Sequence, residues 1–446
     1  MKKIALLSLC FAAAARAATP VSNLGLVSVE DSSLKASKQL QALQAEAEAA
    51  EHKADASRDS LYPRLAADAS YKWLANVPEV KLNPLAPPIK LGDNHNWSLG
   101  LSANWDLFSP RQFKDLKVAE ALHEAKVQEL GAQTATLRLK ARLGYFQTQL
   151  AAERVRLLSN SLVLAQNQAD DLALRVKAGS SSRIDALAAA NEELARRSLL
   201  RAARTDLAAA LRDVFALSGL GQGADPSLPS VEMGDTLPAK VEAPTLVIKL
   251  DPLTDSLQAL SKAAQTRFDP QLSSRLKQLG ALRDAARAQA ELAFTGHYPR
   301  FNVGARVSED YPNGFVPEAT DQEALTANVS VPLYSFGAVK AQVSEADSLA
   351  QASDLRSQAL ATDLERDFLK SKDRLASLSA QRALQEEQVQ QTAALADLVF
   401  KAYKIGGASY LEVQSAELHA LEAGTALAAT ETQLLIELAT LDALSR

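Results

Sequence analysis

Four stretches of the chain alternate between apolar and polar residues, which is the pattern of a β-strand with one apolar and one polar face. In one of them, Trp97 and Leu99 are separated by Ser98. Strands of roughly 9 to 12 residues with an apolar outer face and a polar inner face match a transmembrane β-barrel around water. A soluble antiparallel sheet with one wet face is the alternative interpretation. The predicted strands lie at about 62–73, 97–108, 298–308 and 324–335.

Four strands are too few to close a barrel, because the smallest closed barrels have about eight. An open sheet edge in lipid would leave backbone groups without hydrogen-bond partners, which is very costly. If these strands cross a membrane, two or more copies of the chain must therefore share one barrel. Beyond the N-terminal segment the sequence has no apolar run of 18 or more residues, so we expect strands to make any crossing there.

The longest pattern is a series of apolar or small residues at alternating spacings of three and four, which is typical of a coiled coil. It runs over 127–176 without a charged residue at the repeating positions and returns over 364–403. The first series predicts a helix over 112–177, about 100 Å long at roughly 1.5 Å per residue. Charged residues beside this series, including Arg142 and Arg154, are interpreted as a solvated face.

Each long helix ends at a turn rich in Gly, Ala and Ser, at about 178–185 and at about 405–412. A Gly just past the last helical residue stops a helix, and Ser182 or Ser409 can cap the helix that follows. We therefore expect the chain to fold back antiparallel at both places.

The same order of elements occurs twice, so the chain is a tandem duplication of a unit with a helix, two strands, a very long helix, a turn and a helix. Tyr62-Pro63-Arg64 recurs as Tyr298-Pro299-Arg300, and Leu107-Phe108-Ser109 recurs as Leu333-Tyr334-Ser335. The predicted organisation is a signal peptide at 1–18, a first repeat at 19–218, a linker at 219–252 and a second repeat at 253–446.

The N-terminal segment has the charged start and the apolar run of a secretory signal, with a buried helix as the alternative. Cys10 is the only cysteine, and its removal with the signal would leave no thiol for disulfides, metal sites or nucleophilic catalysis. The net charge of -5 without a basic stripe argues against a nucleic-acid partner. The five His residues are scattered, so we predict no enzyme activity, no cofactor and no metal site.

A secreted, duplicated chain with two strand hairpins and two very long helical hairpins resembles the TolC-like outer membrane efflux family. The resemblance rests on the two Tyr-Pro-Arg strand starts, the Leu-Phe-Ser and Leu-Tyr-Ser-Phe-Gly strand ends, and the Gly-then-acid turns. It implies a mainly α fold with β: long coiled-coil helices plus four transmembrane strands in a trimeric α/β-barrel channel. Three subunits would form one barrel in outer membrane lipid above a helical tunnel in the periplasm. The tunnel would dock through a periplasmic adaptor to an inner-membrane transporter.

The implied function is a passive exit channel for efflux or type I secretion. The alternative is a structural or adhesive periplasmic coiled coil that is anchored in the outer membrane. The polar inner face of all four strands favours the channel, because a water-filled lumen needs such a face and a plain anchor does not. The cargo and the class of pump are left open.

In relatives, acids and a Tyr near the helical turns form a constriction at the tunnel entrance. The resemblance implies this role for Asp185, Tyr403 and Glu412, because each acid lies six residues after a turn Gly and the Tyr three before one. Two family positions differ, with Ala408 in place of an Arg and Ser415 in place of an acid, so such a gate has fewer polar contacts. The alternative is that the two acids only stabilise helix N-termini, by about 0.3–1 kcal/mol.

The turns themselves are the implied contacts with the adaptor. These residues are Gly179, Ser180, Ser181, Gly406, Gly407 and Ala408.

Overall fold

The computed structural model describes residues 23–80, 89–220, 227, 229–231, 246–263, 269, 272–314 and 316–445. The signal peptide expected at 1–18 lies outside these residues and stays a prediction. The chain divides into two compact units, and each unit takes segments from both sequence repeats. Unit 1 comprises residues up to 40, 133–273 and 363–446, and unit 2 comprises 41–132 and 274–362.

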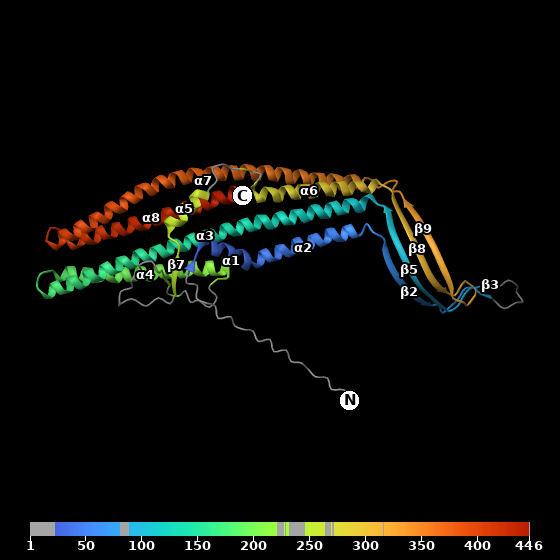
Figure 1. Cartoon of the computed structure of the whole chain (residues 1–446), viewed down its shortest axis with the longest axis horizontal. Coiled ribbons are helices and arrows are strands. Elements are labelled where there is room, and N and C mark those ends of the chain that lie inside the picture. The colour runs from blue at the N-terminus through green and yellow to red at the C-terminus, as the bar shows by residue number, and fades with distance from the viewer. Residues whose placement is uncertain are drawn as a thin grey trace, which may run out of the picture. The chain divides into compact units, whose positions relative to one another are not determined.

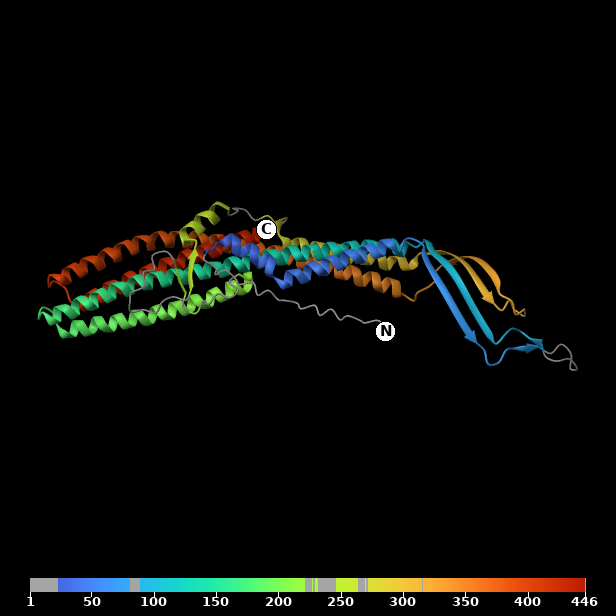
Figure 2. The ribbon, with the colours of Figure 1, turned by 60° about the horizontal axis from the view of Figure 1, so that its bottom comes forward.

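Unit 2 contains one antiparallel sheet of four strands in the order β2-β5-β8-β9, which lie side by side in Figures 1 and 2. The pairing of β5 with β8 joins the two expected hairpins into a continuous sheet. The four predicted strands are thereby confirmed. They are β2 (Arg64–Trp73), β5 (His95–Phe108), β8 (Arg300–Tyr311) and β9 (Thr320–Ser330).

The last strand differs most from its predicted bounds of 324–335. It begins at Thr320, because β8 extends to Tyr311 and the two strands pair as far as Asp310 and Thr320. It ends at Ser330, two residues before Pro332. Proline has no N–H to donate to a β-ladder. The apolar pattern of the sequence therefore continues beyond the last residue that pairs with β8.

The register puts the expected residues on one face of the sheet. Leu65 pairs with Ala103, which pairs with Ala305, which pairs with Leu325. In the single chain this face is open, since the side chains of Leu65 and Leu325 are 81% and 80% exposed. A contiguous apolar surface of this kind is typical of a face that meets lipid or another protein.

Ion pairs between helices join the helical part of unit 2. Glu291 accepts hydrogen bonds from Lys114 at 2.8 Å and from Lys117 at 2.8 Å, and these two contacts lower its pKa to about 2. The unit contains α2 (Lys38–Asp59), α6 (Ser274–Phe294), a short 3-10 turn η2 (Thr295–His297), and the first parts of α3 (Pro110–Lys177) and α7 (Ala338–Lys404). Two short strands, β3 (Glu79–Val80) and β4 (Ile89–Lys90), pair in the loop between β2 and β5.

Unit 1 is built from two helical hairpins. The long helices α3 and α7 have 68 and 67 residues, which confirms the predicted long helices. Each continues through a turn into an antiparallel partner, α4 (Arg183–Ser218) or α8 (Tyr410–Ser445), as Figures 1 and 2 show. The unit also contains α1 (Leu26–Ala36), α5 (Leu253–Ala263), and a small parallel sheet of β1 (Asn23–Leu24), β7 (Leu246–Leu250) and β6 (Pro229–Val231). Among the helices of the described residues, none combines the length and the apolar character needed to span a membrane.

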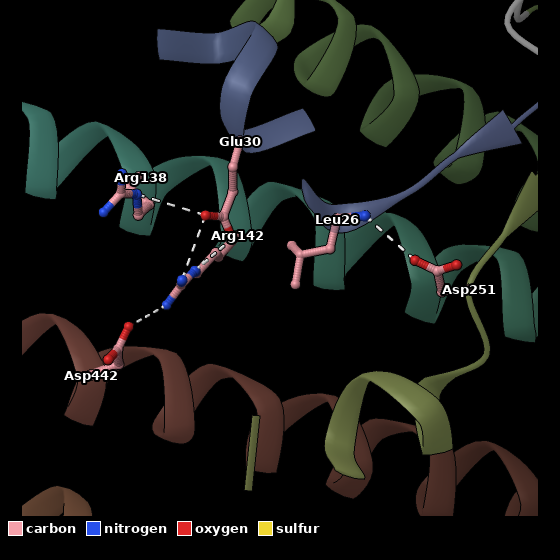
Figure 3. A network of polar contacts seen from close by, with 6 residues as sticks. All are labelled: Leu26, Glu30, Arg138, Arg142, Asp251 and Asp442. Atoms are coloured by element: carbon pink, nitrogen blue, oxygen red, sulfur yellow. Dashed lines mark hydrogen bonds and ion pairs between the residues drawn. The ribbon is translucent and has the colours of Figure 1, made fainter. Parts of the chain in front are cut away.

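The core of unit 1 joins distant parts of the sequence to α3. Tyr145 and Phe146 are fully buried, and the Tyr145 hydroxyl lies 3.0 Å from both the Leu24 carbonyl oxygen and Asp251 Oδ2. Burial raises the pKa of this phenol, and the charge of Asp251 adds to the effect. Asp251 also accepts from the backbone N–H of Leu26, as Figure 3 shows. The N-terminal segment and the inter-repeat segment therefore share one polar anchor on α3.

The prediction that Arg142 lies on the solvated face of α3 is wrong. Its guanidinium donates to Glu30 Oε1 at 2.7 Å and to Asp442 Oδ2 at 2.6 Å, and only 13% of the side chain is exposed (Figure 3). The periodicity of α3 alone could not show that α1 and the end of α8 cover this part of the helix. Arg154, on the same helix, is exposed as predicted.

Candidate functional site at the helical turns

The two long helices end in the same backbone motif. At the first turn, Gly179 N–H donates to the Val176 carbonyl at 3.1 Å and Ser180 N–H donates to the Arg175 carbonyl at 2.9 Å. This pair of bonds is the Schellman motif, which satisfies carbonyls at a helix C-terminus. It requires a left-handed residue, and Gly179 has φ of 73°.

The second turn repeats the motif. Gly406 N–H donates to the Tyr403 carbonyl at 3.0 Å, and Gly407 N–H donates to the Ala402 carbonyl at 2.9 Å. Gly406 has φ of 83°. The two helical hairpins therefore reverse direction through the same backbone motif.

Alanine at either turn glycine is expected to destabilise the protein by about 1–2 kcal/mol, because a Cβ disfavours the left-handed conformation. A Cβ at Gly179 or Gly406 would meet no atom within 4 Å, so the cost comes from the backbone alone. Gly131, within α3, is the matched control, since a Cβ there also meets nothing. Gly131→Ala should instead stabilise by roughly 0.5–1 kcal/mol. Thermal unfolding of the three variants measures both effects, and equal shifts would contradict the motif.

Serine residues cap the helices that follow. Ser182 Oγ accepts from the Ile184 N–H at 3.1 Å. At the second turn, Ser409 Oγ accepts from the Glu412 N–H at 3.3 Å, and Glu412 Oε2 accepts from the Ser409 N–H at 2.9 Å. This reciprocal pair is a capping box. The carboxylate of Glu412 is thus held at its own helix N-terminus.

Asp185 and Tyr403 lie together although they come from different hairpins. The Tyr403 hydroxyl is 3.5 Å from Asp185 Oδ2 and 3.5 Å from Ser181 Oγ, the long end of hydrogen-bond distance. The structure therefore brings two of the three predicted gate residues into one contact. Glu412 is not part of this contact, and its Oε2 accepts in the capping box.

A small apolar core lies behind this contact. Leu172 of α3, Ala189 of α4, and Tyr410 and Val413 of α8 are buried together, and Tyr403 of α7 packs against them. The ring centroids of Tyr403 and Tyr410 are 5.6 Å apart. The helices α3, α4, α7 and α8 thus all contribute to one cluster next to the turns.

The turn residues that were predicted to contact an adaptor are accessible. Gly179, Ser180, Gly406 and Gly407 are exposed, while Ser181 and Ala408 are half-buried. Large apolar side chains beside them are also open to solvent, with Ile184 77%, Ile405 87% and Leu411 73% exposed.

A buried polar layer further along the hairpins was not predicted. Gln168 of α3 donates to Glu417 of α8, and Gln168 Oε1 accepts from the Tyr410 hydroxyl at 3.3 Å. Gln168 directly precedes Ala169, which belongs to the apolar series of α3. A glutamine next to such a series looks like part of the polar face of the helix. The sequence alone therefore gave little indication that Gln168 is buried. The described residues contain no group of His, Cys, Asp and Glu side chains that could hold a metal ion.

A sequence profile of the outer membrane efflux protein family matches residues 30–220 and 270–445. A comparison with curated proteins gives no match. Among solved structures, the outer membrane protein VceC from Vibrio cholerae aligns with a TM-score of 0.71 at 18% identity, over 94% of this chain and 96% of that chain. CusC aligns with a TM-score of 0.71 at 18% identity, over 94% and 92%. The outer-membrane channel OprN gives 0.70 at 17% identity, over 94% and 89%.

Proposed function

The chain belongs to the outer membrane efflux protein family, and we propose that three copies form a passive exit channel served by a periplasmic adaptor and an inner-membrane transporter. It is an outer membrane protein with its long helices in the periplasm. We propose no enzyme activity for it. The transporter would belong to an efflux or a type I secretion system.

The observation that carries the proposal is the sheet of unit 2. Its apolar face is open in the single chain, and its edge strands β2 and β9 each pair with only one other described strand. In lipid, such edges are tolerated only when another chain completes the hydrogen bonding. Four strands from each of three copies would give a closed barrel wide enough for water.

The other face of the sheet supports a wet lumen. Arg306 lies 2.6 Å from Asp68 and donates to Ser98 Oγ at 3.1 Å, and Ser98 donates to Asp310 at 2.5 Å. These charged and polar groups follow the residue alternation that faces away from the apolar side. A purely structural anchor in the membrane, the alternative function, would not need them.

We propose that Asp185, Tyr403 and Glu412 line the periplasmic entrance. The contact between Asp185 and Tyr403 would hold the two hairpins of one chain together in the resting state. Glu412 would contribute negative charge while capping its helix. The exposed turns at Gly179–Ser181 and Gly406–Ala408 would contact the adaptor.

The expected mass of the purified protein in detergent is that of three chains. Native mass spectrometry measures it directly, and chemical cross-linking should stop at the trimer. A stable folded monomer would contradict the proposal, because one chain cannot close a barrel. A dimer or a tetramer would contradict the trimer but not the need to assemble.

A further inference from the structure

The buried layer around Glu417 joins the two helical hairpins of one chain. Gln168 of α3 and Tyr410 of α8 are only 4% and 2% exposed. Gln168 holds both Tyr410 and Glu417 of α8 through its two amide ends. One side chain of the first hairpin thus carries two hydrogen bonds to the second.

The charges in this layer do not balance. Arg196 of α4 is 3% exposed, and its Nε donates to Glu192 at 2.5 Å, while its Nη1 is buried with no hydrogen-bond partner. Glu417 is half-buried, and the charges of both Arg196 and Glu192 act on it. The one guanidinium is thus already paired with Glu192, and Glu417 is a second carboxylate close by in a poorly solvated place, which disfavours its ionisation.

Several other titratable side chains on the surrounding helices have partners of their own. These pairs are Asp171 with Arg175 on α3, Glu193 with Arg197 on α4, Asp397 with Lys401 on α7, and His419 with Glu422 on α8. Glu192 and Arg196 are thus the charges that act on Glu417 from α4, and Gln168, which faces it from α3, is neutral.

We propose that Glu417 is a proton-sensitive lock between the two hairpins, tight when its carboxyl is protonated and loosened when it is ionised. As an acid, the carboxyl can accept from the Gln168 amide and also donate to it. As a carboxylate, it leaves a second negative charge beside Glu192, and this charge is better hydrated if the hairpins separate. The effect of this lock on the resting conductance depends on the proposed channel function.

The electrostatics of the site agree with this direction. Burial raises the pKa of Glu417, and Glu192 adds to the rise, against the opposing effects of Gln168 and Arg196. An acid whose pKa is raised in the closed state stabilises that state at low pH. This stabilisation is lost as the pH rises from the ordinary glutamate pKa through the raised one. Glu417 therefore favours the closed arrangement of the two hairpins at acidic pH.

The test compares wild type with Glu417→Gln, which is uncharged at every pH and close in shape. In planar bilayers, wild-type resting conductance should increase as the pH rises, and Glu417→Gln should stay low throughout. The opening equilibrium changes about tenfold for each pH unit between the pKa values of Glu417 in the closed and open states. Glu422→Gln, at an exposed acid on the same helix, should behave like wild type. Full pH dependence in Glu417→Gln, or none in wild type, would overturn the lock.

Hydrogen exchange of the α8 amides near Glu417 separates the lock from the channel. After correction for the intrinsic pH dependence of exchange, wild type should exchange faster at high pH and Glu417→Gln should not. If this result appears without any conductance, the lock stands and the proposed channel fails. Glu192→Gln gives a second variant in case Glu417→Gln folds poorly. It should shift the wild-type transition to lower pH, because Arg196 would then serve Glu417 alone, and an unshifted transition would contradict the lock.

Discussion

Replacing Arg142 with methionine is expected to destabilise the protein by about 3–5 kcal/mol, because it removes the shortest ion-pair contact of Asp442 and of Glu30, which keeps only the longer contact with Arg138 at 3.7 Å. The side chain of Glu30 is 13% exposed and that of Asp442 is 8% exposed, so hydration can replace little of the lost ion pairing. Burial opposes the charge of Arg142, but its contacts with Glu30 and Asp442 outweigh that cost and raise its pKa. The arginine therefore stays charged at any pH at which the protein folds.

Chemical unfolding of detergent-solubilised protein measures this change. Arg154→Met, at an exposed position of the same helix, is the matched control and should shift stability by less than about 0.5 kcal/mol. A triple variant that also carries Glu30→Leu and Asp442→Leu should recover most of the loss, since it also removes the two carboxylates that Arg142 had neutralised. Equal losses for Arg142→Met and Arg154→Met would show that Arg142 is solvated after all.

Removing the negative charges near the turns is expected to raise resting conductance and to weaken block by polyvalent cations. In the proposed trimer, three copies of Asp185 and Glu412 form carboxylate rings at a narrow neck, which attract cations. The double variant Asp185→Asn with Glu412→Gln removes both charges. Glutamine can keep the capping box at Ser409, so the helix start should be preserved.

Two further variants separate the roles of these residues. Tyr403→Phe removes only the hydroxyl near Asp185, and it should raise resting conductance without changing cation block. Glu412→Ala loses the capping box as well as the charge, and it should cost about 1 kcal/mol of stability. If the charge-neutral double variant conducts and is blocked like wild type while Glu412→Ala melts lower, the acids serve only as helix caps.

Long repetitive patterns made most of the fold predictable from the sequence. The alternation of the strands and the three-four spacing of α3 and α7 extend over many residues, so single exceptions do not hide them. The ends of elements were harder, because they depend on pairing. The apolar alternation of the last strand runs past Ser330, but Pro332 cannot pair.

The features that could not be predicted from the sequence depend on contacts between segments that are far apart in the chain. Arg142 looks solvated until α1 and the end of α8 are placed over it. The layer around Gln168 and Glu417 was missed for the same reason, since Gln168 lies beside the apolar series of α3 and its two partners come from α8. Asp185 and Tyr403 were paired only through the family resemblance, and their contact spans 218 residues of sequence.

Single-channel recording of the purified protein in a planar bilayer shows whether the assembled chains form a channel. We expect discrete conductance steps from a particle with the mass of three chains, with a low resting level that rises in the charge-neutral variant at Asp185 and Glu412. A trimer that inserts into the bilayer but never conducts, in wild type and in that variant alike, would contradict the channel and favour an anchored structural coiled coil.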